Sequence, residues 1–276
     1  MEPQMTSLDR IGNLNPLITV LGFIGRGGLH LTRNLGAMAI FFSLAFINIF
    51  RRKQLREIIN QVFYIGARSS LIVLLVGLFT GMVLGLQLFY TLVQLGSVGY
   101  LGSVISIALV RELGPVLAAI MIAARAGSGI TAEIGILRIS EQIDALYTMR
   151  VDPMRYLISP RIAASIISFP LLTAFFDLIG IMGGYLTGVL LLGTNAGTYF
   201  YRVHSSLTMT DIRGGFIKAL VFGAIVSCIC CFQGYFCHMR TDGYGAKAVG
   251  LATVTAVVLS CVMILIADYV VTSFLM

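Results

Sequence analysis

Long stretches without a charged residue limit what this chain can fold into. Residues 69–110 contain no Asp, Glu, Lys or Arg over 42 positions, and the 21 residues between Lys218 and Arg240 contain none either. Each stretch reaches the length of about 20 residues that a helix needs to cross a bilayer. Only 11% of the 276 residues are charged, against roughly 25% in a soluble domain. We therefore expect an all-α, polytopic membrane protein.

Turn signals divide the apolar sequence into five predicted spans. The 42-residue stretch is too long for one helix, and Gly96, Gly99 and Gly102 favour a turn within it. We predict transmembrane helices at about residues 68–94, 103–124, 160–193, 215–238 and 249–274.

A shorter apolar segment, residues 35–50, precedes these spans and is followed by Arg51, Arg52, Lys53 and Arg56. We predict an N-terminal interfacial helix with its cations at the level of the lipid phosphates; a sixth, tilted span is the alternative. The predicted domains are residues 1–60, a cytoplasmic tail with this helix, and residues 61–276, a transmembrane domain with a cytoplasmic helical segment at about 132–152.

The basic residues predict the orientation. Segments 51–68, 125–161 and 240–247 carry five, five and two Lys or Arg residues, whereas the opposite side carries three, Arg202, Arg213 and Lys218. Cytoplasmic loops are enriched in Lys and Arg. We therefore place the N-terminus in the cytoplasm and the C-terminus on the outer side. The net charge of +7 reflects this topology, and we expect no nucleic-acid partner.

No catalytic motif accompanies the spans. The sequence has no phosphate-binding G-x-x-x-x-G-K-[ST] loop, no H-E-x-x-H and no G-x-S-x-G. We predict that the chain is not an enzyme, needs no cofactor and leaves any ATP to a partner. Cys228, Cys230 and Cys231 do not share one helical face, so we predict no metal site there.

The segment 131–153 is the most organised polar region. We predict that Ser140 caps a short helix with Glu141 and Asp144 in its first turn, where acids suit the helix dipole. Its apolar stripe consists of Ile143, Leu146 and Met149. This helix either docks a cytoplasmic partner or rests on the lipid surface.

The second span carries Arg111 and Glu112 within its apolar length. Charges inside a membrane are costly and usually face a cavity or a partner. Neighbouring residues point about 100° apart on a helix, so we do not expect these two to form an ion pair with each other. A clamp between helices and a contact with a lipid headgroup both remain open.

The first span has two distinct faces. Gly77, Gly81 and Gly85 recur every fourth residue, as Gly180, Gly184 and Gly188 do in the third span, and such faces let helices approach closely within one subunit or between two copies. A bulky apolar stripe faces either bulk lipid or a pocket; its members are Leu84, Leu88, Leu92 and Leu95.

Several motifs occur together in order: GMVLGLQ at 81–87, RELGPVLAA at 111–119, ARAGSGITAEIG at 124–135, EQIDAL at 141–146 and VDPMRYLISPR at 151–161. Over about residues 14–274 the chain resembles the MlaE-type permeases, also called the YrbE or Mce-associated permease family. That resemblance implies an ABC-type complex for phospholipid trafficking in the bacterial inner membrane. Two permease copies would pair with two cytoplasmic ATPase subunits and a periplasmic ring of Mce-domain proteins.

The resemblance also implies roles for individual residues. Leu84, Leu88, Leu92 and Leu95 match a lipid pocket between the two copies, and Arg111 and Glu112 match a charged pair near it. The residues of the ATPase-coupling helix would be Glu141, Asp144, Leu146, Tyr147 and Met149, although relatives often carry an acidic residue where this chain has Tyr147.

Two other functions remain open. An ion-coupled secondary transporter would use Glu112, Asp177 or Asp268 as a relay, and a non-transporting scaffold would hold the Mce protein.

Overall fold

The computed structural model describes residues 36, 40, 41, 43, 55–240 and 243–275. The chain divides into residues 1–43 and 44–276, and the second of these is described here by itself. The predicted interfacial helix at 35–50, and its alternative as a sixth span, lie largely outside the described residues.

Five helical segments of the described residues are long and apolar enough to cross a membrane, which confirms the predicted number of spans. They are Leu55–Gln94, Val98–Ile139, Met154–Leu191, Met209–Tyr235 and Ala246–Leu275.

The first three spans are interrupted by short π-helical turns. The first consists of α2 (Leu55–Val62), η3 (Phe63–Ala67) and α3 (Arg68–Gln94). The second consists of a 3-10 turn η4 (Val98–Tyr100), α4 (Leu101–Ala108), η5 (Leu109–Leu113), α5 (Gly114–Ile122), η6 (Ala123–Gly127) and α6 (Ser128–Ile139). The third consists of η7 (Met154–Ile158), α8 (Ser159–Tyr185) and η8 (Leu186–Leu191).

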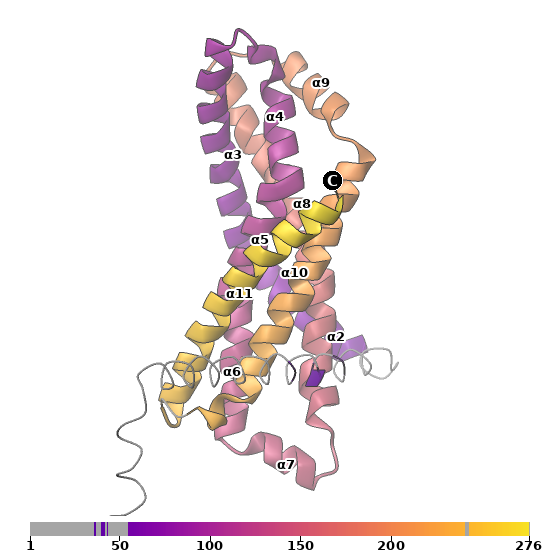
Figure 1. Cartoon of the computed structure of the whole chain (residues 1–276), viewed down its shortest axis with the longest axis vertical. Helices are drawn as coiled ribbons and strands as arrows, with labels where there is room; N and C mark the ends of the chain where they lie inside the picture. Colours follow the sequence, from indigo (N-terminus) through magenta and orange to yellow (C-terminus); the bar gives the residue numbers. More distant parts are fainter. Residues whose placement is uncertain (1–35, 37–39, 42, 44–54, 241–242, 276) are drawn as a thin grey trace, which may run out of the picture. The chain divides into compact units, whose positions relative to one another are not determined.

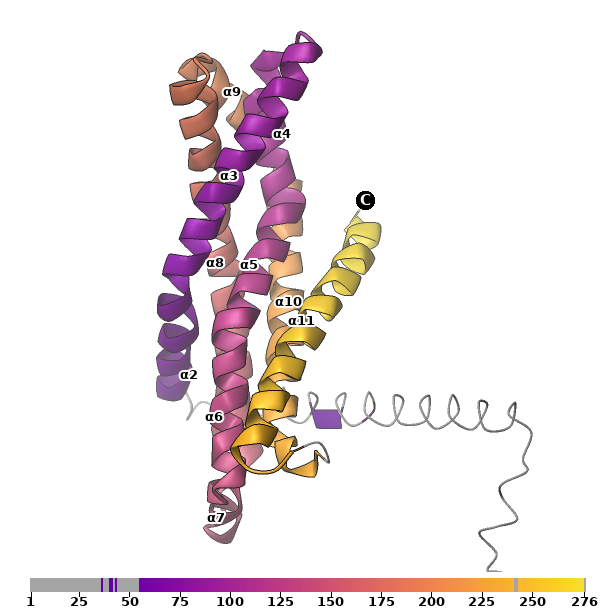
Figure 2. The same ribbon diagram turned by 90° about the vertical axis from the view of Figure 1, so that its left-hand side faces the viewer.

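The remaining two spans are single helices, α10 (Met209–Tyr235) and α11 (Ala246–Leu275). The short helix α7 (Gln142–Thr148) and the connection from α10 to α11, which includes η9 (Cys237–Met239), lie at one end of the bundle. The turn between α3 and α4, and the helix α9 (Ala196–Ser206), lie at the other end (Figures 1 and 2).

The glycine faces pack within one chain. A Cβ at Gly81 would overlap the backbone carbonyl of Gly180, and one at Gly77 would lie 2.9 Å from the carbonyl oxygen of Phe176. At Gly85 it would lie 3.3 Å from the carbonyl oxygen of Gly184. The backbones of α3 and α8 therefore touch at successive turns, as small residues allow, and these glycines are not a seam between two copies.

The fourth span begins earlier than predicted. α10 starts at Met209 rather than at residue 215, because Thr208 and Asp211 form a reciprocal capping box that satisfies the first free N–H groups. Ahead of it lies α9, which we did not predict. Asn195 caps α9 by accepting from the Thr198 N–H, and the buried hydroxyl of Tyr199 donates to the carbonyl of Ile181 over 2.9 Å.

The segment predicted to be cytoplasmic differs from its prediction at Ser140. The second span continues to Ile139, and the Ser140 hydroxyl donates back to the Ile136 carbonyl at 2.8 Å, so Ser140 is not the cap of α7. Glu141 occupies that position in a left-handed conformation with φ of 59°. The predicted segment 132–152 therefore contains the end of α6, a sharp turn and the separate helix α7.

Candidate functional site

Charged side chains from three spans meet inside the apolar part of the bundle. Arg111 and Glu112 lie in η5, where the helix widens ahead of Pro115. Because proline has no N–H, it cannot donate to the carbonyl four residues earlier, that of Arg111. Lys218 of α10 supplies a donor instead, with its Nζ 2.9 Å from that carbonyl oxygen.

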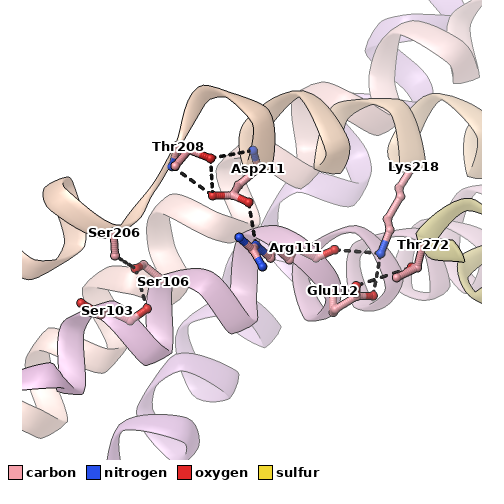
Figure 3. Close-up of polar contacts among 9 residues, drawn as sticks. All are labelled: Ser103, Ser106, Arg111, Glu112, Ser206, Thr208, Asp211, Lys218 and Thr272. Atoms are coloured by element: carbon pink, nitrogen blue, oxygen red, sulfur yellow. Dashed lines mark hydrogen bonds and ion pairs between the residues drawn. The ribbon is translucent and has the colours of Figure 1, made fainter. Parts of the chain in front are cut away.

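Arg111 and Glu112 each have a partner on another helix. Arg111 Nε donates to Asp211 Oδ1 at 2.6 Å, and Lys218 Nζ donates to Glu112 Oε2 at 2.6 Å. The same Nζ lies 3.0 Å from Asp268 Oδ1 on α11. Figure 3 shows Arg111 pointing toward Asp211, and Glu112 pointing toward Lys218 and Thr272. The structure thus contains the clamp between helices that the sequence left open.

Lys218 is the centre of this network and was misplaced from the sequence. We counted it among the cations at the outer end of its span, but it is 2% exposed and lies more than two turns inside α10. The sequence did hold a signal: Thr208 and Asp211, three residues apart, form the T-x-x-D pattern of a helix start.

A cavity of about 320 Å³, lined by several polar and charged residues, opens beside the network. Its lining residues are Arg111, Glu112, Thr208, Thr210, Asp211, Gly214, Gly215, Lys218, Thr272 and Leu275. The side chains of Arg111 and Glu112 are 44% and 40% exposed, whereas those of Lys218 and Asp211 are only 3% and 7% exposed. Part of the Arg111 guanidinium is therefore open to an incoming polar group.

The four leucines predicted as a lipid stripe have different environments. Leu84 and Leu88 are half-buried, Leu92 is buried and Leu95 is 70% exposed. Leu84 borders a separate apolar hollow of about 410 Å³ on the surface of α3, with Leu75, Val76, Phe79, Thr80 and Val83. The leucines and the charged pair do not share one cavity among the described residues.

Some of the predicted coupling residues are exposed to solvent, and others contact the rest of the protein. Glu141 and Met149 are exposed. Leu146 borders a groove of about 270 Å³ between α6, α7 and η7. Asp144 accepts from Arg138 at 2.7 Å, and the hydroxyl of Tyr147 lies 2.8 Å from that of Tyr235. Sequence reasoning did not find Arg138 or Tyr235, because nothing in the sequence places α7 beside the end of α10.

The acids of the ion-relay hypothesis are also placed. Glu112 and Asp268 both form ion pairs with Lys218. Asp177 of α8 is half-buried, and its Oδ1 has no hydrogen-bond partner among the described residues.

Comparisons with known proteins place this geometry in context. Residues 58–274 match the family described as Permease MlaE. A protein of Rickettsia bellii named probable ABC transporter permease protein is 40% identical over 257 residues, covering 93% of this chain and 97% of the relative. The intermembrane phospholipid transport system permease protein MlaE of Haemophilus influenzae is 40% identical over 225 residues, covering 81% and 84%. The chloroplastic protein TRIGALACTOSYLDIACYLGLYCEROL 1 of Arabidopsis thaliana is 38% identical over 219 residues, covering 79% and 61%.

Proposed function

This chain belongs to the MlaE permease family, and from that premise we propose that it moves phospholipids between the inner membrane and a periplasmic Mce-domain protein. It is a multi-pass membrane protein related to ABC transporter permeases. In this proposal ATP is bound and hydrolysed by a separate subunit, and the permease acts as a homodimer.

The observation that carries the proposal is the charged cavity inside the bundle. Four ionisable groups line it, Arg111, Glu112, Asp211 and Lys218. Asp268 of a third span pairs with Lys218, although each intramembrane charge costs roughly 2.5 to 3.5 kcal/mol on insertion scales. Ionisable side chains within spans usually mark a functional site. A cavity that offers a partly open guanidinium suits a phosphate, which arginine binds through two parallel N–H groups.

The lipid tails require an apolar surface, and the outer face of α3 offers one. Leu75, Phe79 and Val83 are all well exposed around the apolar hollow that Leu84 borders. Such a surface accommodates acyl chains without selecting a headgroup. We propose that the second copy closes this hollow and brings the leucine stripe, Leu84, Leu88, Leu92 and Leu95, toward Arg111 and Glu112.

The cytoplasmic end supports docking of an ATPase. α7 projects from the end of the bundle (Figure 1) and exposes Glu141, Tyr147 and Met149. We propose the orientation that places α7 and the N-terminus in the cytoplasm and the C-terminus in the periplasm. α9 and the turn between α3 and α4 then face the periplasm and the proposed Mce ring.

A copurification experiment tests the assignment of α7. The chain is expressed with its ATPase subunit and purified through a tag on the permease. Wild-type permease should retain the ATPase, and the double variant Glu141→Lys with Asp144→Lys should lose most of it, because the charges at the cap and in the first turn of α7 both reverse. Lys247→Glu, at the same end of the bundle, is the matched charge-reversal control. If the double variant retains the ATPase as well as the wild type does, α7 is not the docking helix.

A further inference from the structure

Side-chain contacts connect α7 to α10, a span that does not adjoin α7 in the sequence. The hydroxyl of Tyr147 lies 2.8 Å from that of Tyr235, the last residue of α10. Arg138 of α6 donates to Asp144 of α7 at 2.7 Å and to Nδ1 of His238 in η9 at 3.1 Å. Its guanidinium carbon also lies 5.6 Å from the centre of the Tyr235 ring. We call these five residues the cytoplasmic clamp.

The clamp joins two spans that are also joined inside the membrane. At the cytoplasmic end it connects α6, the last part of the second span, to the end of α10. Near the opposite end, Arg111 and Glu112 of the second span bind Asp211 and Lys218 of α10. The two attachment points on α10, Lys218 and Tyr235, are 17 residues apart, or about 25 Å along a helix.

Between these points α10 is closely packed. A Cβ at Gly223 would lie 3.1 Å from the carbonyl oxygen of Ser165 on α8, and one at Gly234 would lie 2.8 Å from that of Thr131 on α6. α10 also contains no proline along its 27 residues, and prolines are a common cause of sharp helix kinks. A displacement of its cytoplasmic end is therefore expected to move the helix as one piece.

The chain turns sharply on both sides of α7. Glu141 and Arg150 are the two residues other than glycine with positive φ in the part of the chain that the structure describes, at 59° and 57°. These bends separate α7 from the helices before and after it, α6 and η7. The backbone connections of α7 therefore do not hold it against α10. The side chains of the clamp supply that connection.

We propose that Tyr147, Tyr235 and Arg138 are positioning residues that make α10 follow the ATPase-docking helix α7, so that both sides of the charged cavity move together during transport. This inference rests on the proposed function. Without the clamp, a movement of α7 would reach α10 only through the packing of α6 against it, and Lys218 and Asp211 would follow Arg111 and Glu112 less closely.

The experiment removes one hydroxyl at a time from the full complex of permease, ATPase and Mce protein in liposomes. Tyr147→Phe, Tyr235→Phe and the double variant each keep the aromatic ring and lose the bond between the hydroxyls. ATP hydrolysis and transfer of a fluorescent phospholipid are measured on the same preparation. We expect the lipid moved per ATP to fall by about fivefold, the equivalent of one neutral hydrogen bond. The double variant should be no worse than either single variant, because all three lose the same bond.

Tyr244→Phe is the matched control, because Tyr244 lies at the same end of the bundle and is 87% exposed; it should keep the wild-type ratio. If the assembled Tyr235→Phe complex moves as much lipid per ATP as the wild type, the inference is overturned, even where its thermal midpoint is lower, since the bond then serves only the fold. A wild-type complex that hydrolyses ATP without moving lipid would instead refute the proposed function.

Discussion

Lys218 illustrates how a single residue can hold an intramembrane site together. Its ammonium group serves two carboxylates, Glu112 and Asp268, and one backbone carbonyl, that of Arg111. Those three groups come from η5 and α11, while Lys218 itself comes from α10. A buried charge is tolerated only when it is paired and hydrogen-bonded, and Lys218 meets both conditions.

Removing the lysine should therefore destabilise the protein more than removing one of its acids. Lys218→Met leaves two carboxylates facing each other, and breaking a buried pair from one side costs roughly 3 to 5 kcal/mol. We expect a clear fall in the thermal midpoint of the detergent-purified protein. Adding Glu112→Gln to Lys218→Met should restore part of it, because one of the opposed charges is then removed. No restoration in the double variant would contradict the pairing.

His238 gives the cytoplasmic clamp a dependence on pH. Burial, and then the positive charge of Arg138, lower the pKa of His238 below its ordinary value, which is about 6.5. The charged side chains that act on it are Arg138 of α6 and Asp144 of α7. Nδ1 can accept from Arg138 only while the imidazole is neutral.

The direction of the change in stability with pH follows from proton uptake by His238. Above about pH 6.5 the histidine is neutral in both states; as the pH falls below that value the unfolded chain binds the proton first, so the free energy of unfolding decreases. The effect should be small because His238 is only partly shielded from solvent. Thermal midpoints at pH 7.5 and 5.5 should differ less in His238→Gln than in the wild type, with His204→Gln as control. An equal difference in wild type and His238→Gln would rule out this role.

At the residue scale, sequence reasoning found the charges but not their partners. The motif RELGP drew attention to Arg111 and Glu112, because charges within an apolar span stand out. Lys218 and Asp211 lie about 100 residues further on, and periodicity within one helix cannot show which face of another helix it meets. The partners required the packing of η5, α10 and α11.

At the scale of elements, the contact between α3 and α8 is the most demanding. Both helices are 27 residues long, and they touch through glycines whose missing side chains allow the backbones to meet. Because their approach is set by backbone atoms, a side chain at Gly77 or Gly81 forces the helices apart.

Gly81→Ala should therefore be strongly destabilising. The added methyl group would overlap the Gly180 carbonyl, and overpacking of this kind typically costs about 1 to 3 kcal/mol or more. Gly250→Ala in α11 is the matched control, because a Cβ there meets nothing within 4 Å; it should be neutral or slightly stabilising. The comparison is made by thermal denaturation in detergent. Equal midpoints for the two variants would show that α3 and α8 do not approach as closely as described.

Hydropathy predicted the helices well and their ends less well. Span number and type followed from uncharged length alone, and α3 was located correctly because Arg68 precedes its apolar run. The start of α10 was placed too late because Asp211, Arg213 and Lys218 resemble the charges of a loop. α9 was missed because its eleven residues are too few and too polar to stand out as a membrane span.

At the scale of the whole molecule, the proposed lipid pocket needs a second copy of the chain to close it. Photo-crosslinkers at Leu84 and Leu88 should capture phospholipid in the solubilised complex, because these half-buried residues border or adjoin the apolar face of α3. A crosslinker at Val258 of α11, which is 59% exposed, should capture less. Equal capture at the three positions would mean that the leucines contact only bulk lipid.

The most direct measurement of the central claim is phospholipid transfer by the reconstituted complex. Permease and ATPase are placed in liposomes with a fluorescent phospholipid, and transfer to the Mce-domain protein is followed with ATP, with a non-hydrolysable analogue and with a proton gradient. Our account predicts that transfer requires ATP hydrolysis and both subunits. Glu112→Lys should impair this transfer more than Glu112→Gln does, because the new lysine adds an unpaired cation beside Lys218. Transfer by the permease alone, driven by a proton gradient without ATP, would contradict it.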